Sequence, residues 1–300
     1  MKNITVIHMG AVGDLVQALP LLRAVRAKWP AAKIALVGHP ERAAIARLAG
    51  LADACVHFDS FSNSLAAHQR ADLVVDLFCA GRPGPAYGGT VRLEPFPPPG
   101  WTDSAAAWVL RQGRQALDLP AVPETPEFLI PRASLDAAAD FLAARGIRGN
   151  FAAIHPGSGS PKKNWPLDRF VAAAGRLRQE HGRTVVWLAG PAEQERGTLA
   201  PLGAGENVLA RLRLEQAAAV LALTDVYVGN DSGITHLAAA VRRTDGRPTP
   251  TVALFGPTDP RLWAPRGPHV RVVRSPDGMM EGIGTERAWA EIARLVDLPV

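Results

Sequence analysis

A short turn near the N-terminus carries an acidic side chain where a reaction could use one. The stretch His8-Met-Gly-Ala-Val-Gly-Asp14 follows an apolar run, and Gly10 and Gly13 permit a tight turn that a ligand can approach closely. Asp14 stands where the next helix is expected to begin. Its carboxylate could cap that helix, act as a general base, or do both. Spacing alone favours the cap.

A second polar loop follows a predicted strand in the middle of the chain. It runs from His155 to Pro166 and is made of small residues and two adjacent lysines. Small residues expose backbone N–H groups and a lysine adds a point charge, which together suit a phosphate. A plain surface loop with solvated lysines is the simpler interpretation of this stretch alone. The candidate ligands are Ser158, Gly159, Lys162 and Lys163.

A third turn, Val228-Gly-Asn-Asp-Ser-Gly-Ile-Thr-His236, places a strand, a turn and a helix start within a few residues. The free N–H groups of a first helical turn attract anions, so Ser232 and Gly233 suit a diphosphate. Asp231 could bind sugar hydroxyls or cap the helix. For His236 a buried structural role is the simpler interpretation.

Two further strand ends also carry carboxylates. Glu193, in Gly190-Pro-Ala-Glu193, could accept a hydrogen bond from a ribose hydroxyl. Asp259, in Phe255-Gly-Pro-Thr-Asp-Pro260, belongs either to another ligand loop or to a turn without ligand contact.

Apolar strand-like runs alternate with helical periodicity along nearly the whole chain, which predicts parallel sheets covered on both faces. We expect an N-terminal domain at 1–130, a C-terminal domain at 131–280 and a terminal helix within 281–300, with packing back on the first domain as one option. The Pro- and Gly-rich stretch 82–100 predicts a loop, and 120–131 predicts the linker. In such sheets ligands bind beyond the carboxyl ends of the strands, where all these motifs fall.

Composition limits the classes of function. The 300 residues are 47% hydrophobic and carry a net charge of +5. A positive charge favours anionic partners, and solubility alone is the simpler explanation of so mild a charge. No basic run or nucleic-acid motif is present, so nucleic acid is disfavoured. Cys55 and Cys79 form no CxxC motif and lie in apolar stretches. This pattern predicts two buried thiols in a reducing compartment. A signal-peptide pattern and a long apolar span are both missing from the sequence, which predicts a cytoplasmic protein.

Common cofactor and metal sites are also disfavoured. The first turn is GxxG rather than GxGxxG, the second strand ends in Gly38-His39-Pro40 without an acid for a ribose, and GxxxxGK[ST] is missing. Neither a DxD motif nor metal-ligand spacing occurs, so we expect no metal. Lysine, backbone N–H groups and helix dipoles would have to stabilise a leaving group.

Taken together, these motifs resemble glycosyltransferase family 9, whose best-known members are the ADP-heptose:lipopolysaccharide heptosyltransferases. The resemblance spans nearly the whole chain through MGAVGD with Pro20, HPGSG…K.WP, GNDSG.THLAAA and LFGPTDP…WAP. It implies a GT-B fold of two Rossmann-like domains facing across a cleft, a nucleotide-sugar donor, no cofactor, and metal-independent transfer with inversion.

The resemblance also implies roles for single residues. Asp14 matches the catalytic base, and Lys163 matches a lysine that contacts the diphosphate. Asp231, Ser232 and Gly233 match the turn that holds the donor sugar and diphosphate. Glu193 resembles a ribose-binding acid, Ser158 an adjacent hydroxyl contact, and Leu212 a residue lining the adenine pocket.

The implied enzyme moves heptose from ADP-heptose to an anionic glycolipid of the lipopolysaccharide core, as a monomer that touches the inner membrane transiently. The acceptor side departs from the family pattern, since only Asp76-Leu77 remains of a DLQG-type stretch. Alternatives are another nucleotide sugar or glycan, or a catalytically silent nucleotide-sugar binding protein. A periplasmic-type binding protein is disfavoured because the sequence shows no signal peptide.

Overall fold

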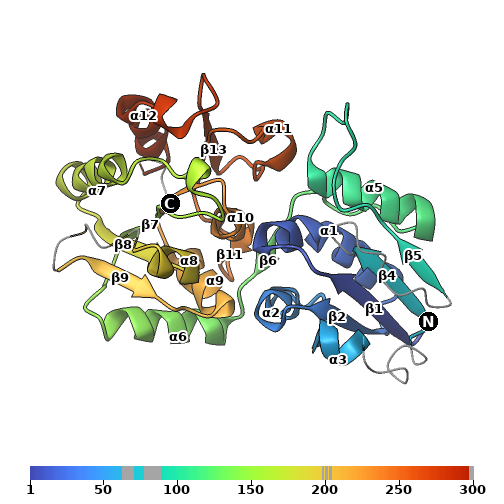
Figure 1. Ribbon diagram of the computed structural model, residues 1–300. Helices are drawn as coiled ribbons and strands as arrows, with labels where there is room; N and C mark the ends of the chain where they lie inside the picture. The colour runs from blue at the N-terminus through green and yellow to red at the C-terminus, as the bar shows by residue number, and fades with distance from the viewer. Residues whose placement is uncertain (63–70, 78–88, 198, 200–201, 203–204, 297–300) are drawn as a thin grey trace. The chain divides into compact units, whose positions relative to one another are not determined.

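The computed structural model describes residues 1–62, 71–77, 89–197, 199, 202 and 205–296 of the chain (Figure 1). The chain divides into two compact units, Met1–Pro126 and Glu127–Val300. Each unit contains its own parallel sheet.

The sheet of the first unit has the strand order β3-β2-β1-β4-β5, all parallel. The central strand β1 (Asn3–His8) lies between β2 and β4, so the order reverses beside it, which creates a ligand-binding switch point at its carboxyl end. The other strands are β2 (Lys33–Gly38), β3 (Ala54–His57), β4 (Leu73–Leu77) and β5 (Thr90–Arg92).

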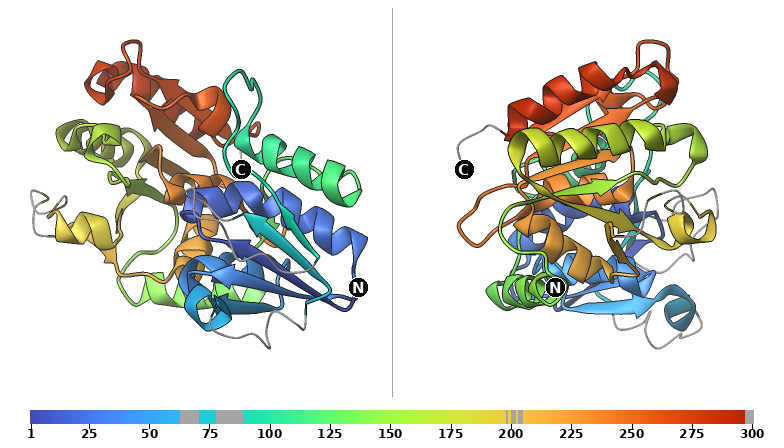
Figure 2. Two further views of the ribbon diagram at one scale, coloured as in Figure 1. Left: turned by 45° about the vertical axis from the view of Figure 1, so that its right-hand side comes forward. Right: turned by 90° about the vertical axis from the view of Figure 1, so that its left-hand side faces the viewer.

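Helices of the first unit cover its apolar strands. The long helix α1 (Val12–Lys28) lies alongside α5 (Ala105–Leu117), as Figures 1 and 2 both show. The hydroxyl of Ser104 caps α5 by accepting a hydrogen bond from the Ala107 N–H at 3.1 Å. The remaining helices are α2 (Pro40–Leu48) and α3 (Phe58–Ser62).

The sheet of the second unit has the strand order β13-β12-β10-β7-β8-β9, again parallel. Its switch point lies at β7, which pairs with β10 on one side and with β8 on the other. The strands are β7 (Phe151–His155), β8 (Thr184–Ala189), β9 (Asn207–Ala210), β10 (Val226–Asn230), β12 (Thr251–Phe255) and β13 (Val270–Arg274).

Helices cover both faces of this second sheet. Helices α7 (Leu167–His181) and α12 (Thr285–Val296) share one apolar core with alternate residues of the strands, including Val226 and Val228. Tyr227 points to the opposite face, where its hydroxyl lies 3.0 Å from Thr235 Oγ1 of α10 (Gly233–Ala240). The right-hand view of Figure 2 shows the resulting layers.

Short elements complete the second unit. Strands β6 (Phe128–Leu129) and β11 (Val241–Arg242) pair with each other. The remaining elements are α6 (Arg132–Ala143), η1 (Pro161–Lys163), α8 (Pro191–Glu195), α9 (Leu214–Leu223), α11 (Pro260–Trp263) and η2 (Met280–Gly282).

Several expectations need correction. The described part of the expected loop at 82–100 contains β5, and the expected linker at 120–131 contains β6. Strand β13 forms the edge of the second sheet beside β12. The terminal helix α12 packs into the core of the second unit, so residues 281–296 do not form a separate element.

The prediction that both cysteine thiols are buried can be checked for one of them. Cys55 is partly exposed, so the prediction that it is buried is wrong. Among the described strands, its strand β3 is at the edge of the sheet. Cys79 lies outside the described residues.

Candidate functional site

The first unit places Asp14 in the opening turn of α1, directly after the switch-point strand β1. The residue that caps the helix is Ala11, so the interpretation of Asp14 as the N-cap is wrong by three positions. Asp14 Oδ2 instead accepts a hydrogen bond from the Ala11 N–H at 2.8 Å and so stabilises the start of the helix. The side chain is half-buried, which leaves its carboxylate open to a ligand.

Gly10 allows this turn to close on itself. A Cβ atom at position 10 would lie 2.9 Å from Asp14 Oδ2 and 2.9 Å from His8 Cε1, so a larger residue would separate the two side chains. Burial lowers the pKa of His8, despite the opposing charge of Asp14, which favours a neutral imidazole beside the carboxylate. Gly13 lies inside α1 rather than in the turn, contrary to expectation.

In the second unit, strand order explains why distant motifs meet. The loops that follow β7, β8 and β10 leave the same edge of the sheet, because these three strands are parallel neighbours. They bring together Lys163, Glu193 and Asp231 with the N-terminus of α10.

An ion pair joins the loop after β7 to the turn after β10. Lys163 Nζ lies 2.7 Å from Asp231 Oδ2, and the carboxylate is only 8% exposed whereas the lysine is 34% exposed. A buried carboxylate is stabilised by a partner of opposite charge. The lysine therefore keeps its ammonium group at the edge of the sheet, beside the first turn of α10.

Asn230, the last residue of β10, holds the loop that follows β7 in place. Its side chain donates a hydrogen bond to Pro156 O at 2.8 Å and accepts one from the Trp165 N–H at 3.0 Å. The residue is fully buried, so these bonds are shielded from water. Asn230 lies inside the motif that contains Asp231, but its position in the sequence alone does not point to this role.

Glu193 is held by backbone and side-chain partners. Its Oε2 accepts a hydrogen bond from the Gly190 N–H at 2.8 Å and lies 3.4 Å from His155 Nε2. Gly157 packs directly on the carboxylate, because a Cβ at position 157 would lie 2.0 Å from Glu193 Oε1. Burial alone would favour the neutral acid, but the bond to His155 and its charge lower the pKa of Glu193 below its ordinary value.

The other expected ligands occupy different environments. Ser158 is buried, and its Oγ lies 2.7 Å from Ser160 O and 2.6 Å from Asn164 Oδ1. Gly159 and Lys162 are exposed on the same loop. Leu212 is half-buried just before α9, and His236 is buried in α10.

Asp259 makes its contacts with a neighbour in the sequence. Its carboxylate caps α11 by accepting from the Arg261 N–H at 3.0 Å, and it also pairs with the Arg261 guanidinium at 2.7 Å. The Arg261 side chain holds the pKa of Asp259 at about 2. This carboxylate is engaged within its own turn.

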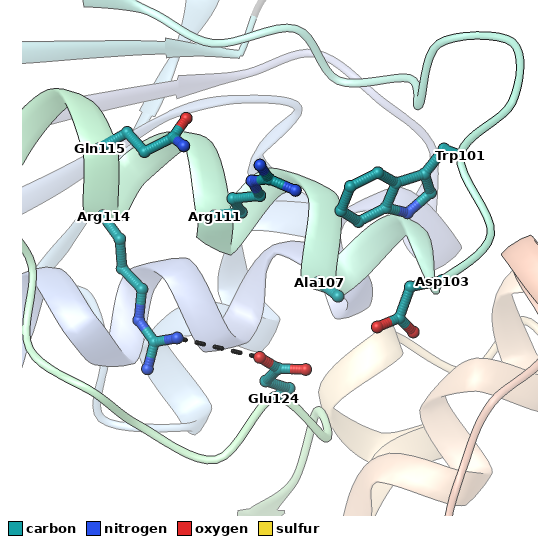
Figure 3. Close-up of a pocket in the computed structure, with 7 residues that line it drawn as sticks. All are labelled: Trp101, Asp103, Ala107, Arg111, Arg114, Gln115 and Glu124. Carbon is teal, nitrogen blue, oxygen red and sulfur yellow. Dashed lines mark ion pairs between the residues drawn. The ribbon is translucent and has the colours of Figure 1, made fainter.

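A separate pocket of about 360 Å³ lies on the first unit (Figure 3). The indole of Trp101 is fixed by a hydrogen bond from Nε1 to Ser104 O at 3.1 Å, and the Arg111 guanidinium lies 5.5 Å from its ring centre. Both signs of charge line the pocket, with Arg114 and Glu124 forming a long ion pair at 3.9 Å. The lining residues are Trp101, Asp103, Ala107, Arg111, Arg114, Gln115 and Glu124.

The chemistry available at these sites is therefore divided between the units. The first unit presents a carboxylate after β1, suited to accepting a proton. The second presents a lysine, hydroxyl groups and free helix N–H groups, which suit a diphosphate. Within the described ranges, no three His, Cys, Asp or Glu side chains gather in a way that could hold a metal ion.

Comparison with known proteins gives a family and a fold. Residues 109–288 match the family described as glycosyltransferase family 9 (heptosyltransferase). Lipopolysaccharide heptosyltransferase 2 of Salmonella typhimurium is 35% identical over 121 residues, which are 38% of this chain and 33% of that protein. The chain thus matches only about a third of this curated relative's length.

Two solved structures share the fold over nearly their whole length. The ADP-heptose lipopolysaccharide heptosyltransferase II of E. coli has a TM-score of 0.78 at 20% identity, covering 99% of this chain and 98% of that one. The family 9 glycosyltransferase of Veillonella parvula has a TM-score of 0.77 at 19% identity, covering 98% and 97%. At this identity they establish the GT-B fold expected from the sequence.

Proposed function

We propose that this chain, which belongs to glycosyltransferase family 9, transfers heptose from ADP-heptose to an inner-core acceptor of lipopolysaccharide. The observation that carries the donor side is the Lys163–Asp231 ion pair at 2.7 Å, beside the free N–H groups that open α10. A cation and a helix N-terminus at one sheet edge are what a diphosphate requires.

In the proposed reaction each named group has one task. Asp14 accepts the proton of an acceptor hydroxyl as that oxygen attacks the anomeric carbon. The bond from the anomeric carbon to the diphosphate breaks on the opposite face, so the configuration inverts. The charge that develops on the departing diphosphate is stabilised by Lys163, the Ser232 hydroxyl and the N–H groups of α10, without a metal ion.

The donor's other parts have candidate contacts in the second unit. We assign its ribose to Glu193, its base to the neighbourhood of Leu212 and its sugar to Asp231. Glu193 already accepts from Gly190 and lies beside His155, so a ribose hydroxyl would add a donor to a carboxylate that is already ionised. Ser158, Gly159 and Lys162 would complete the loop over the phosphates.

The acceptor is assigned to the first unit. Its Trp101 pocket offers an aromatic face for a sugar ring, together with arginine, carboxylate and amide groups for hydroxyls and for acidic substituents. We further propose that the chain acts as a cytoplasmic monomer and contacts the membrane surface, where a lipid-linked acceptor lies. Among the residues that the structure describes, none of the helices has the length and apolar character needed to span a bilayer.

Two assays test this proposal. Thermal-shift measurements with ADP, UDP, GDP and their sugars should give the largest increase in melting temperature with the adenine series, since ligands that bind the native state stabilise it. Incubation of ADP-heptose with heptose-free lipopolysaccharide core should then yield ADP and a glycolipid heavier by one heptose. If ADP is released only when a different sugar donor is supplied, the alternative donor is favoured. If the nucleotide sugar binds but no sugar is transferred, the catalytically silent binding protein is favoured.

A further inference from the structure

The peptide group between Gly10 and Ala11 is held on two sides by charged side chains. Asp14 Oδ2 accepts a hydrogen bond from the Ala11 N–H at 2.8 Å, and Arg42 Nη1 donates one to Gly10 O at 3.0 Å. This peptide bond is trans, so its C=O and N–H groups point in opposite directions. A guanidinium and a carboxylate are therefore connected through a single peptide group, directly after the switch-point strand β1.

The order of the strands brings Arg42 to this turn. Strands β1 and β2 are parallel neighbours, and their last residues, His8 and Gly38, pair with each other. Gly38 allows the close approach, because a Cβ atom at position 38 would lie 2.3 Å from His8 O. Helix α2 begins at Pro40, so Arg42 in its first turn lies beside the turn that follows β1.

The local structure of α2 does not explain an arginine at position 42. A cation in the first turn of a helix opposes the helix dipole. The side chain is half-buried, and among the described residues it has no carboxylate partner, with Gly10 O as its one hydrogen-bond acceptor. Burial lowers the pKa of His8, and the charge of Arg42 acts in the same direction, so this charge reaches the turn. The contact with Gly10 is thus the specific interaction that the guanidinium makes.

This contact affects the carboxylate on the other side of the peptide. Hydrogen bonds in a chain polarise one another, so a guanidinium on Gly10 O makes the Ala11 N–H a stronger donor to Asp14 Oδ2. The other carboxylate oxygen, Oδ1, makes no hydrogen bond within the described ranges. One oxygen of Asp14 is therefore fixed and the other is left for a proton.

We propose that Arg42 is a positioning residue for Asp14: it holds the Gly10–Ala11 peptide, whose N–H fixes Oδ2 and leaves Oδ1 to take the proton of the acceptor. This inference rests on the proposed function, because it takes Asp14 as the base. Arg42 acts through the peptide and not on a substrate, so its loss should slow the transfer step without weakening the binding of either substrate.

Steady-state kinetics of Arg42→Met test this distinction, since methionine keeps an unbranched stem and removes the guanidinium. The kcat should fall about tenfold, because a misplaced base slows the reaction, and both KM values should stay within about twofold. Arg42→Lys keeps a charged donor and should stay within about threefold of the wild-type kcat. Arg47→Met, at an exposed arginine of the same helix, is the control. A raised acceptor KM with normal kcat would overturn the proposal and make Arg42 an acceptor contact.

A double-mutant cycle asks whether Arg42 acts through Asp14. In an Asp14→Asn background the base is missing, so Arg42→Met should lower the residual rate, measured in single turnover with excess enzyme, by no more than about twofold. Losses that multiply would mean that Arg42 acts independently of Asp14, which contradicts the proposal. Melting curves establish that each variant is folded, and Arg42→Gln replaces the methionine variant if that one unfolds.

Nuclear magnetic resonance detects the same contact without any activity. Labelling glycine carbonyls with carbon-13 and alanine amides with nitrogen-15 selects the Gly-Ala pairs, of which the sequence has two, Gly10-Ala11 and Gly203-Ala204. In Arg42→Met the Ala11 amide proton should move upfield and exchange faster, because its hydrogen bond is weaker, whereas the second pair should keep its signal. An unchanged Ala11 signal would overturn the proposal.

These outcomes are separable from those of the proposed function. A chain that transfers heptose with the same kcat in Arg42→Met as in the wild type keeps that function and loses this inference. A chain that transfers no sugar loses the proposed function, and the Ala11 signal still decides whether Arg42 holds the Asp14 carboxylate in place.

Discussion

Lys163 Nζ lies 2.7 Å from Asp231 Oδ2, although the two residues are far apart in the chain and follow different strands. The lysine therefore has two tasks in the proposed donor site: it neutralises a buried carboxylate and it attracts the diphosphate.

Replacing Lys163 by alanine should weaken the binding of a nucleotide diphosphate by about 10- to 100-fold, because a charge-assisted contact is lost. Lys162→Ala is the matched comparison, since that lysine is adjacent and exposed. Isothermal titration with ADP should show the larger loss for Lys163. A larger loss of ADP affinity for Lys162→Ala would show that Lys162, and not Lys163, makes the phosphate contact.

Asp14→Asn should reduce sugar transfer by about 100- to 10,000-fold while donor affinity stays within about twofold, because the amide cannot act as a base. The amide oxygen can still accept from the Ala11 N–H, so the start of α1 should be preserved. Rates of ADP release and donor titrations test both statements. Asp136→Asn, an exposed acid of α6, is the control, and near-normal transfer by Asp14→Asn would remove Asp14 from the base role.

Asn230→Ala should lower the free energy of unfolding by about 2–4 kcal/mol, because it leaves the Trp165 N–H and Pro156 O unpaired in the interior. Since these bonds hold the loop that carries Lys163, donor affinity should fall as well. Urea unfolding and ADP titration measure the two effects. A stable variant with normal affinity would show that the loop is held by other contacts.

Asp225 precedes β10, at the opposite end of the strand from Asp231. Its Oδ2 is buried, makes no hydrogen bond to any described residue, and lies 3.9 Å from Arg183 Nη1. Burial raises the pKa of Asp225 above its ordinary 3.8, so ionisation costs the folded state more than the unfolded chain. This cost is full above the raised pKa and disappears as pH falls below about 3.8.

Asp225→Asn should therefore stabilise the chain by about 0.5–1.5 kcal/mol at neutral pH, with the gain shrinking toward pH 4. Urea unfolding at several pH values tests the sign, and transfer activity serves as the control because the site is at the other end of the strand. A gain that stays constant with pH would mean that ionisation is not its cause.

Trp101→Ala should raise the acceptor KM about 3- to 10-fold and leave the donor KM unchanged, since an aromatic face for the acceptor sugar is lost. Trp101→Phe keeps a ring and should restore part of the affinity. Initial rates with each substrate varied in turn distinguish the two constants. A change confined to the donor KM would contradict the assignment of the pocket.

The sequence predicted the parallel α/β architecture and most helices because their apolar periodicity is strong. It missed β5 and β6, which have only three and two residues, because pairing partners rather than local pattern decide the conformation of such short strands. In the candidate site, Lys163, Asp231 and Ser232 could be named from their motifs. The contacts of Asn230 and His155 could not, because they join loops that only the sheet order brings together.

The division between Pro126 and Glu127 has a consequence for how such a protein can vary. Each half has its own sheet and interior, so most substitutions in one half need no compensating change in the other. If the proposed assignment of donor and acceptor to different halves holds, the two preferences can diversify at different rates. The family match at 109–288 falls mainly on the second half, the half to which we assign the donor.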